Sequence, residues 1–552
     1  MSAMGVRAKR LALLLLGAAG SAGLLWLFGS QEPLWVSAGW VSLVPWLWVL
    51  DRAASRRETV LAGVAMGCAF NAALFGWFPG SLQSYSGAPL AVCWLAFLVL
   101  SPFMELQFIT FALTRYHLRR TAQESPRGFW RATLTGALVY VGTEWVSPKL
   151  FAVTLGQGFI ASESLRQGAD IAGTHGLTLV LVIVNACVLE AGRALMAHGM
   201  REGSRRALAP VAVGAALVLA CFGYGQFRYR QVAALEASQQ QLTVGVVQAN
   251  ITKYEKLAAE MGTYDVVRMI LDTHYRLSAE LLQNRKLDLL IWPETVYPTT
   301  FGTPKSDAGA EFDAEIREFV SRGQVPLLFG TYDLEQEREY NAAMFLGPGR
   351  NGALERSAYR KTMLFPLTEW VPELLDSQWL REQMPWTGYW KRGPGPQTMA
   401  LQLGGGRAIT VAPLICYESI FPNYVAEEAR RGAELIITLS NDSWFSGTPA
   451  PKQHLMHAAF RSIETRLPQV RVTNSGISAL ISPTGQVLAE VPDDHRASLA
   501  MTVPLPPRVP TLMVLWGDWL GPTALVLSLM LLLTPPLLAR RKALRAARAV
   551  SS

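Results

Sequence analysis

Long apolar segments dominate the first 225 residues and set the strongest limit on how this chain folds. Most of them approach the about 20 residues that are needed to cross the hydrocarbon core of a bilayer. The segments lie near 11–28, 34–50, 59–79, 89–114, 132–147, 173–192, 207–224 and, after a long polar region, 513–538. A chain with 50% hydrophobic and only 17% charged residues is too apolar for an ordinary soluble protein of this size. The sequence therefore predicts a polytopic membrane protein with about eight spans.

Positive charges recur in every second loop between these segments, whereas the loops at 29–33 and 80–88 contain no Lys or Arg. The clusters contain Arg52, Arg56, Arg57, Arg115, Arg119, Arg120, Arg193, Arg201, Arg205 and Arg206, and Arg540, Arg541 and Lys542 follow the last segment. Because cytoplasmic loops are enriched in Lys and Arg, we expect both termini in the cytoplasm. The first segment is then a retained anchor rather than a cleaved signal peptide. The net charge of +8 indicates topology, not nucleic-acid binding.

The region between residues 226 and 511 has a different pattern, and its about 280 residues are enough to bury a core of their own. Short apolar runs such as LTVGVVQAN, LDLLIWPE and ELIITLSND alternate with helical segments at 263–283, 311–322, 419–431 and 453–466. Such alternation predicts an α/β domain whose sheets are buried on both faces. The expected domains are a seven-span bundle at 1–225, this domain at 226–511, and an eighth span with a basic tail at 512–552. The loop charges place the α/β domain outside the cytoplasm, which is the periplasm in a Gram-negative cell.

Cys416 is the one cysteine of the chain that lies in polar sequence, so it has no disulfide partner there. Cys68, Cys93, Cys187 and Cys221 all fall in apolar segments, where a thiol usually packs as a small apolar group. Cys416 follows a buried strand and precedes a helix that we expect to begin near Ser419. Helix N-terminal amides lower a thiol pKa, which favours a nucleophile. A buried inert thiol is the alternative.

Four further charged residues are candidates for the same site. Glu294 ends an apolar strand, where it could serve as a general base or simply cap a helix. Lys361 could stabilise an oxyanion, although taken alone it would be interpreted as a surface lysine. Glu418 and Glu369 could orient the lysine or shape a pocket, or could be ordinary surface carboxylates.

A pair of histidines and a pair of aromatic residues lead to two further predictions. His454 and His457 lie three residues apart on a predicted helix without Cys, Asp or Glu at metal-ligand spacing, so we interpret them as structural or pocket-lining and expect no metal. Trp444 and Phe445 lie among turn residues and predict either a mobile loop that dips into lipid or a packed loop.

The motifs WPE, RKTMLFPLTEWVP, ICYE, NDSWF, QH and TNSG, in this order, resemble the carbon–nitrogen hydrolase (nitrilase) superfamily. The membrane segments on both sides resemble one of its branches, the apolipoprotein N-acyltransferases. The resemblance implies an αββα sandwich in which Glu294 is the general base, Lys361 stabilises the oxyanion and Cys416 is the nucleophile. Glu369, Glu418 and Tyr417 would support them. The sequence departs from the family pattern at Leu257, in the loop 446–452 and at Ser475.

The resemblance further implies an N-acyltransferase of the bacterial inner membrane that needs no cofactor. A phospholipid would donate an acyl chain to Cys416 as a thioester, and the N-terminal diacylglyceryl-cysteine of an apolipoprotein would accept it. A membrane-tethered amidase or hydrolase that passes the thioester to water is one alternative. A transporter or sensor with a catalytically inactive binding domain is another, and intramembrane acids such as Glu105 and Glu144 would favour transport.

Overall fold

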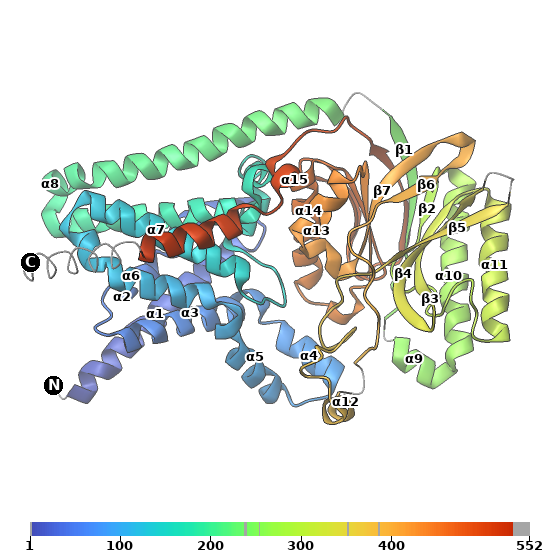
Figure 1. Cartoon of the computed structure of the whole chain (residues 1–552), viewed down its shortest axis with the longest axis horizontal. Helices are drawn as coiled ribbons and strands as arrows, with labels where there is room; N and C mark the ends of the chain where they lie inside the picture. Colours follow the sequence, from blue (N-terminus) through green and yellow to red (C-terminus); the bar gives the residue numbers. More distant parts are fainter. Residues whose placement is uncertain (1–2, 237–239, 253, 350–352, 385–386, 534–552) are drawn as a thin grey trace, which may run out of the picture. The chain divides into compact units, whose positions relative to one another are not determined.

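The computed structural model describes residues 3–236, 240–252, 254–349, 353–384 and 387–533, and it divides the chain into two compact units. The first unit comprises Met1–Gln83, Gly87–Gln226 and Asp518–Ser552, and it is helical. The second comprises Ser84–Ser86 and Phe227–Gly517 and contains all the strands of the described chain. Figure 1 shows the helices of the first unit and the sheets of the second.

The helices that begin before residue 226 are α1 (Ala3–Phe28), α2 (Val44–Leu50), α3 (Arg56–Phe75), α4 (Phe78–Ser86), α5 (Leu90–Met104), α6 (Leu106–Glu124), α7 (Pro126–Val146) and α8 (Ala169–Glu236). Four described helical segments are long and apolar enough to cross a membrane: Ala8–Phe28, Pro33–Leu50, Arg56–Phe75 and Leu165–Leu235. A fifth is obtained when α5 and α6, which are bent by 50° relative to each other, are taken as one span. The predicted membrane protein is therefore supported, whereas the count of eight spans stays a prediction.

Two of the predicted spans, 173–192 and 207–224, lie within α8 and are separated by a break at Gly199. This glycine has φ +67°, a conformation that side chains disfavour, and α8 folds back on itself there (Figure 1). The contact between the two arms is built from the small residues Ala191, Ala194 and Ala207. The predicted eighth span appears as a 14-residue apolar helix, Leu520–Leu533; residues 534–538, Arg540, Arg541 and Lys542 lie outside the described part of the chain.

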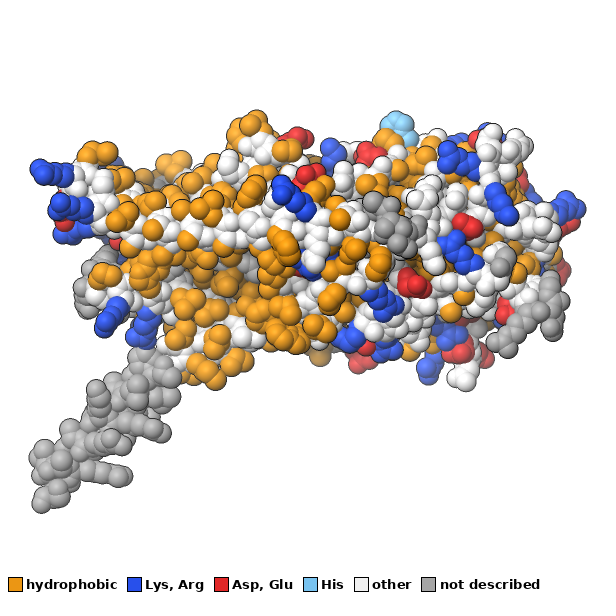
Figure 2. Space-filling view, turned by 90° about the horizontal axis from the view of Figure 1, so that it is seen from above, with side chains coloured by type: hydrophobic (Ala, Val, Ile, Leu, Met, Phe, Trp, Pro, Cys, Tyr) orange, Lys and Arg blue, Asp and Glu red, His pale blue; other side chains and the backbone are white. Residues whose placement is uncertain are grey.

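Hydrophobic side chains are exposed over much of the helical unit, and Figure 2 shows them gathered on a broad surface with few charged side chains among them. Leu16, Leu208 and Leu219 are each exposed by more than 65%. Apolar patches of this extent are unfavourable in water and are typical of surfaces that face lipid or a partner. The unit is therefore suited to a bilayer.

Buried charges inside the helical unit are paired with one another. Lys149 Nζ lies 3.5 Å from Glu105 Oε2 and 3.4 Å from Glu144 Oε1. His175 Nδ1 lies 3.1 Å from Asp518, and its Nε2 is 4.0 Å from Glu144. Glu105 and Glu144, the two acids that favoured a transport function, thus have basic partners within the unit and serve as contacts between its segments.

The second unit contains two six-stranded mixed sheets, with strand orders β12-β1-β2-β3-β4-β5 and β11-β10-β9-β8-β7-β6. The first has β1 (Gln241–Gln248), β2 (Leu289–Ile291), β3 (Leu327–Glu335), β4 (Arg338–Pro348), β5 (Leu354–Arg360) and β12 (Ala497–Pro504). The second has β6 (Met399–Gln402), β7 (Ala408–Ile415), β8 (Leu435–Ser440), β9 (Gln469–Thr473), β10 (Ser478–Ile481) and β11 (Val487–Val491). The central strands β1-β2-β3 and β7-β8-β9 are parallel, and the outer pairings are antiparallel.

The two sheets face each other across one apolar core, and helices cover their outer faces. Val246, Leu328 and Phe345 of the first sheet belong to the same buried cluster as Val411 and Ile437 of the second. The remaining helices of this unit are α9 (Tyr254–Met261), α10 (Thr263–Asn284), α11 (Asp307–Gly323), α12 (Gln378–Gln383), α13 (Pro422–Arg430), α14 (Ala450–Thr465) and α15 (Leu512–Trp516). Helices α10 and α11 pack on the first sheet and α13 on the second, which gives the layers α–β–β–α (Figure 1). The predicted α/β fold is confirmed.

The strand order brings candidate residues together with Asn441, which the sequence analysis did not single out. Glu294 follows β2, Cys416 follows β7 and Asn441 follows β8, so all three lie at the carboxyl ends of parallel strands. Lys361 directly follows β5. Sites in α/β domains gather at such strand ends because the connecting turns converge there.

Gly330 in β3 lies against the turn that carries Glu294. A substitution at Gly330 therefore tests how tightly this turn is packed. A Cβ at this position would lie 2.5 Å from Glu294 Cα, 2.5 Å from Thr295 N and 2.6 Å from Pro293 O, which are all backbone atoms. We expect Gly330→Ala to displace the turn and to destabilise the protein by about 1–3 kcal/mol, measured by thermal unfolding. Gly323→Ala is the control, because its Cβ would meet side chains at 3.5 Å or more. If Gly330→Ala and Gly323→Ala were destabilised equally in thermal unfolding, this packing would be contradicted.

Candidate active site

Cys416 occupies a strained turn at the end of β7. Its φ is +51°, in the left-handed region that non-glycine residues rarely adopt, and strain of this kind is concentrated at functional sites. Cys416 begins a short 3₁₀ helix, Cys416–Ile420, and α13 starts only at Pro422, so the helix expected near Ser419 is interrupted. The carboxyl end of the strand thus holds the thiol in a fixed position.

The expectation that this turn lowers the thiol pKa is wrong. Burial raises the pKa of Cys416, the charge of Glu294 raises it further, and Lys361 only partly offsets both effects. A short 3₁₀ helix offers few aligned amides to oppose burial. Cys416 is therefore held as a protonated thiol at neutral pH, and a base must remove its proton when it reacts.

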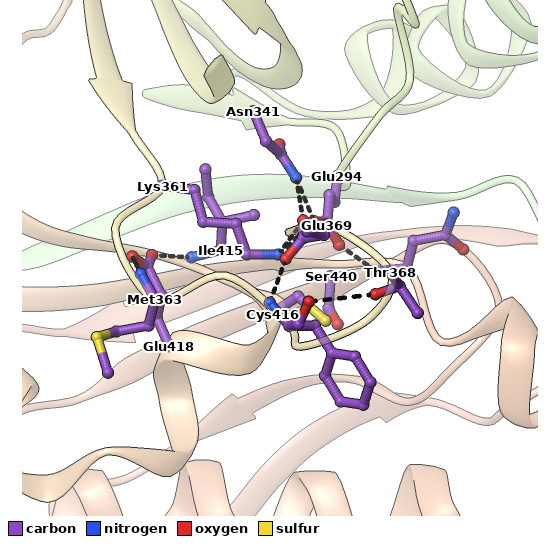
Figure 3. A network of polar contacts seen from close by, with 12 residues as sticks. Glu294, Asn341, Lys361, Met363, Thr368, Glu369, Ile415, Cys416, Glu418 and Ser440 are labelled. Carbon is purple, nitrogen blue, oxygen red and sulfur yellow. Dashed lines mark hydrogen bonds and ion pairs between the residues drawn. The ribbon is translucent and has the colours of Figure 1, made fainter. Parts of the chain in front are cut away.

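Lys361 lies between two carboxylates beside Cys416 (Figure 3). Its Nζ is 3.1 Å from Glu294 Oε1 and 2.8 Å from Glu369 Oε1. The side-chain amide of Asn341 donates to the same two oxygens, at 2.9 and 3.0 Å. Burial alone would lower the pKa of Lys361, but the charges of Glu294 and Glu369 raise it well above its usual value. The lysine therefore stays an ammonium, which suits stabilisation of an oxyanion and not the role of a base.

Each carboxylate also has a backbone partner for its second oxygen. The Asn441 N–H donates to Glu294 Oε2 at 3.0 Å, and the Phe365 N–H donates to Glu369 Oε2 at 2.7 Å. Both carboxylates are thereby fixed in direction. Glu369, interpreted from the sequence as either a supporting or a surface carboxylate, is part of the lysine site.

Glu418 ties the loop after Lys361 to the Cys416 turn. One of its oxygens accepts hydrogen bonds from the N–H groups of Thr362 (2.7 Å) and Met363 (3.2 Å). The other accepts from the Ile415 N–H and the Tyr359 hydroxyl, each at 2.8 Å. Burial raises the pKa of Glu418 to about 7, and these donors oppose the rise. Glu418 is therefore a structural link between the lysine and the cysteine, as Figure 3 shows.

The remaining predicted site residues, Tyr417, Trp444 and Phe445, differ in how far they are exposed. Tyr417 is buried, and its ring makes edge contacts with Phe365 and Phe421, each with centroids 5.0 Å apart. Trp444 is 41% exposed and Phe445 is half-buried, both in the short helix Ser443–Phe445. Contact of this loop with lipid stays a prediction.

One group at the site was not predicted from the sequence, and another lies closer to Cys416 than its general prediction implied. Asn341 lies on β4, a strand that the apolar pattern did not reveal, and no local motif marks it. His454, interpreted as structural or pocket-lining, lies 3.2 Å from the backbone oxygen of Cys416. Within the described ranges, no group of three or more His, Cys, Asp and Glu residues is arranged to hold a metal ion.

Comparisons with known proteins identify the family. Residues 237–506 match the carbon–nitrogen hydrolase family, and residues 22–187 match the apolipoprotein N-acyltransferase N-terminal domain. The apolipoprotein N-acyltransferase of Bdellovibrio bacteriovorus is 29% identical over 86% of this chain and 85% of its own length. The proteins of the same name from Chlorobaculum tepidum and Pseudomonas putida are 26% and 29% identical, over 88% and 87% of this chain and 90% and 88% of their own lengths.

A carbon–nitrogen hydrolase domain joined to apolar helices defines a membrane-embedded class of acyltransferases within the nitrilase superfamily. This chain belongs to the apolipoprotein N-acyltransferase family.

Glu294→Gln tests the electrostatic coupling at the site. Removing this negative charge, which raises the pKa of Cys416, should let the thiol ionise at lower pH. We expect the pH profile of iodoacetamide alkylation at Cys416 to move to lower pH by about one unit in this variant, with each profile scaled to its own highest rate so that only the thiol pKa is compared. The measurement is alkylation of the Cys416 peptide against pH, followed by mass spectrometry. The exposed Glu373→Gln is the control; a Cys416 profile that stays unchanged or moves to higher pH in Glu294→Gln would refute the coupling.

Proposed function

We propose that this chain moves an acyl chain from a phospholipid, through a thioester on Cys416, to the N-terminal diacylglyceryl-cysteine of apolipoproteins. The observation that carries the proposal is the buried cluster in which Lys361 lies between Glu294 and Glu369 beside the Cys416 thiol. The names of the relatives, all apolipoprotein N-acyltransferases, support the choice of acceptor.

The first half-reaction forms the thioester. Glu294 accepts the proton of the Cys416 thiol while the sulfur attacks the ester carbonyl of the phospholipid. Lys361 stabilises the negative charge that develops on the carbonyl oxygen. The ester C–O bond then breaks, and Glu294 returns its proton to the leaving oxygen, so that a lysophospholipid departs.

The second half-reaction uses Lys361 and Glu294 again, but the Cys416 sulfur is now the leaving group. The neutral α-amino group of the diacylglyceryl-cysteine attacks the thioester carbonyl, and Lys361 again stabilises the oxyanion. Glu294 accepts a proton from the attacking nitrogen and returns it to the sulfur as the C–S bond breaks. The products are an amide on the lipoprotein and the Cys416 thiol, so the enzyme returns to its starting state.

The membrane segments would hold the site at the bilayer. We propose eight spans, seven at 1–225 and one at 512–552, with both termini in the cytoplasm and the domain at 226–511 in the periplasm, as the loop charges predict. Donor and acceptor are both lipids, so tethering the site to the bilayer confines the search to two dimensions and helps to position them. The loop with Trp444 and Phe445 would contact lipid there.

The thioester is the first test. Purified protein incubated with phospholipid vesicles and no acceptor should gain the mass of one acyl chain on the Cys416 peptide, and neutral hydroxylamine should remove it. Cys416→Ala should melt at the same temperature as the parent and gain no acyl chain, whereas Cys68→Ala, which alters a half-exposed thiol of α3, should behave like the parent. Acylation of the Cys416→Ala variant would refute the mechanism.

The acceptor is the second test. A synthetic peptide that begins with diacylglyceryl-cysteine should remove the acyl group from Cys416 and become blocked at its amino terminus. The same peptide with an acetylated amino terminus should leave the thioester intact. Rapid loss of the thioester to water in either case would indicate a hydrolase and contradict the proposed transfer.

A further inference from the structure

Two side chains hold the backbone carbonyl of Cys416. The Ser419 hydroxyl donates to this oxygen at 2.9 Å, and the His454 Nε2 lies 3.2 Å from it. Ser419 Oγ and His454 Nε2 are themselves 3.0 Å apart. Ser419 belongs to the same short helix as Cys416, but His454 comes from α14, so it ties the Cys416 carbonyl to another element.

The contacts of His454 fit a ring that carries a hydrogen on Nε2. A carbonyl oxygen can only accept, so a hydrogen on Nε2 is needed for the ring to bind the Cys416 carbonyl. Nδ1 lies 3.1 Å from Asp442 Oδ1 and 3.1 Å from Arg471 Nη2. With its hydrogen on Nε2, the ring can accept from Arg471 at Nδ1 and donate to Cys416 at Nε2.

The groups behind His454 form a rigid support. Asp442 and Arg471 are almost completely buried and are joined at 2.7 Å. Ser440 also donates to Asp442 Oδ1 at 2.7 Å. Burial alone would raise the pKa of Asp442, but the charges of Arg471 and His454 outweigh it and lower this pKa, so the carboxylate remains charged. The end of β8 and the strand β9 thus fix the orientation of the imidazole ring.

We propose that His454, held by Asp442 and Arg471, is a positioning residue that fixes the peptide group between Cys416 and Tyr417 during acyl transfer. The carbonyl and the N–H of one peptide group point in opposite directions. Fixing the Cys416 carbonyl toward His454 therefore directs the Tyr417 N–H away from it, where the oxyanion of an acyl group on Cys416 can accept it. This inference rests on the proposed function and adds a residue that acts through the backbone.

A matched pair of substitutions separates the contact to Cys416 from the contacts behind it. In His454→Gln the side-chain amide reaches the position of Nε2 and keeps a donor for the Cys416 carbonyl. In His454→Asn the amide reaches only the position of Nδ1, so the carbonyl loses this donor. A misdirected oxyanion donor lowers a rate by about 10²-fold. We expect about this loss in kcat for thioester formation in His454→Asn, with KM for phospholipid unchanged, and less than about fivefold loss in His454→Gln.

Alkylation of Cys416 by iodoacetamide is the second readout, because this reaction forms no oxyanion. We expect both variants to be alkylated within about threefold of the parent rate at the same pH, which a general disturbance of the site would not allow. Thermal unfolding checks that each variant is folded. The parent protein must form the thioester in the same assay, and its failure to do so would count against the proposed function instead.

Three outcomes would overturn the role of His454. The first is parent-like kcat in His454→Asn. The second is a loss in His454→Gln as large as about 10²-fold, which would assign the role to the imidazole ring itself. The third is a loss in the alkylation rate of Cys416 as large as the loss in kcat for thioester formation in the same variant. If His454→Asn does not fold, His454→Gln alone decides: retention of at least about a fifth of the parent kcat supports the proposal and a lower value refutes it.

Discussion

The ammonium group of Lys361, enclosed between Glu294 and Glu369, is the interaction on which the site depends. A buried charge is unfavourable unless it is paired and its remaining hydrogen-bonding groups are satisfied. The segments after β2 and β5 supply Glu294, Lys361 and Glu369, and Asn341 and two backbone N–H groups hold the carboxylates. Removing Lys361 would leave two buried carboxylates without a cation between them, so the fold must bring these segments together before the site can exist.

Glu418 fixes the position of Cys416 relative to Lys361. Its carboxylate binds backbone N–H groups on both the lysine loop and the residue before Cys416, so the two functional groups cannot move independently. The left-handed conformation of Cys416 is sustained by these contacts rather than by local preference. Because the pKa of the thiol is raised, little of Cys416 is thiolate at neutral pH, which would also slow its oxidation in the proposed periplasmic location.

Much of the α/β fold could be predicted because its parallel strands β1, β2, β3, β7, β8 and β9 are buried on both faces and are therefore continuous apolar runs. Strand β5, LERSAYR, lies at a sheet edge with four consecutive exposed residues and gave no such signal. Lys361 was selected by the ordered motifs of a family, because its own neighbourhood resembles a surface. Asn341 and the role of His454 were missed because a contact to a distant carboxylate or backbone oxygen leaves no spacing pattern in the sequence. The pKa of Cys416 depended on burial and on Glu294, which only the three-dimensional arrangement supplies.

The presence of two carboxylates for one lysine fits the charge that the site would carry through the proposed reaction. With Glu294 and Glu369 ionised and Lys361 protonated, the three groups have a net charge of −1 while the thiol is neutral. Transfer of the thiol proton to Glu294 makes them neutral and the sulfur −1, so the total does not change. Glu369, the closer partner of Lys361 at 2.8 Å, keeps the lysine paired after Glu294 is protonated. A buried site can therefore generate a thiolate and then an oxyanion without ever taking up an additional charge, which is the step that burial would penalise most.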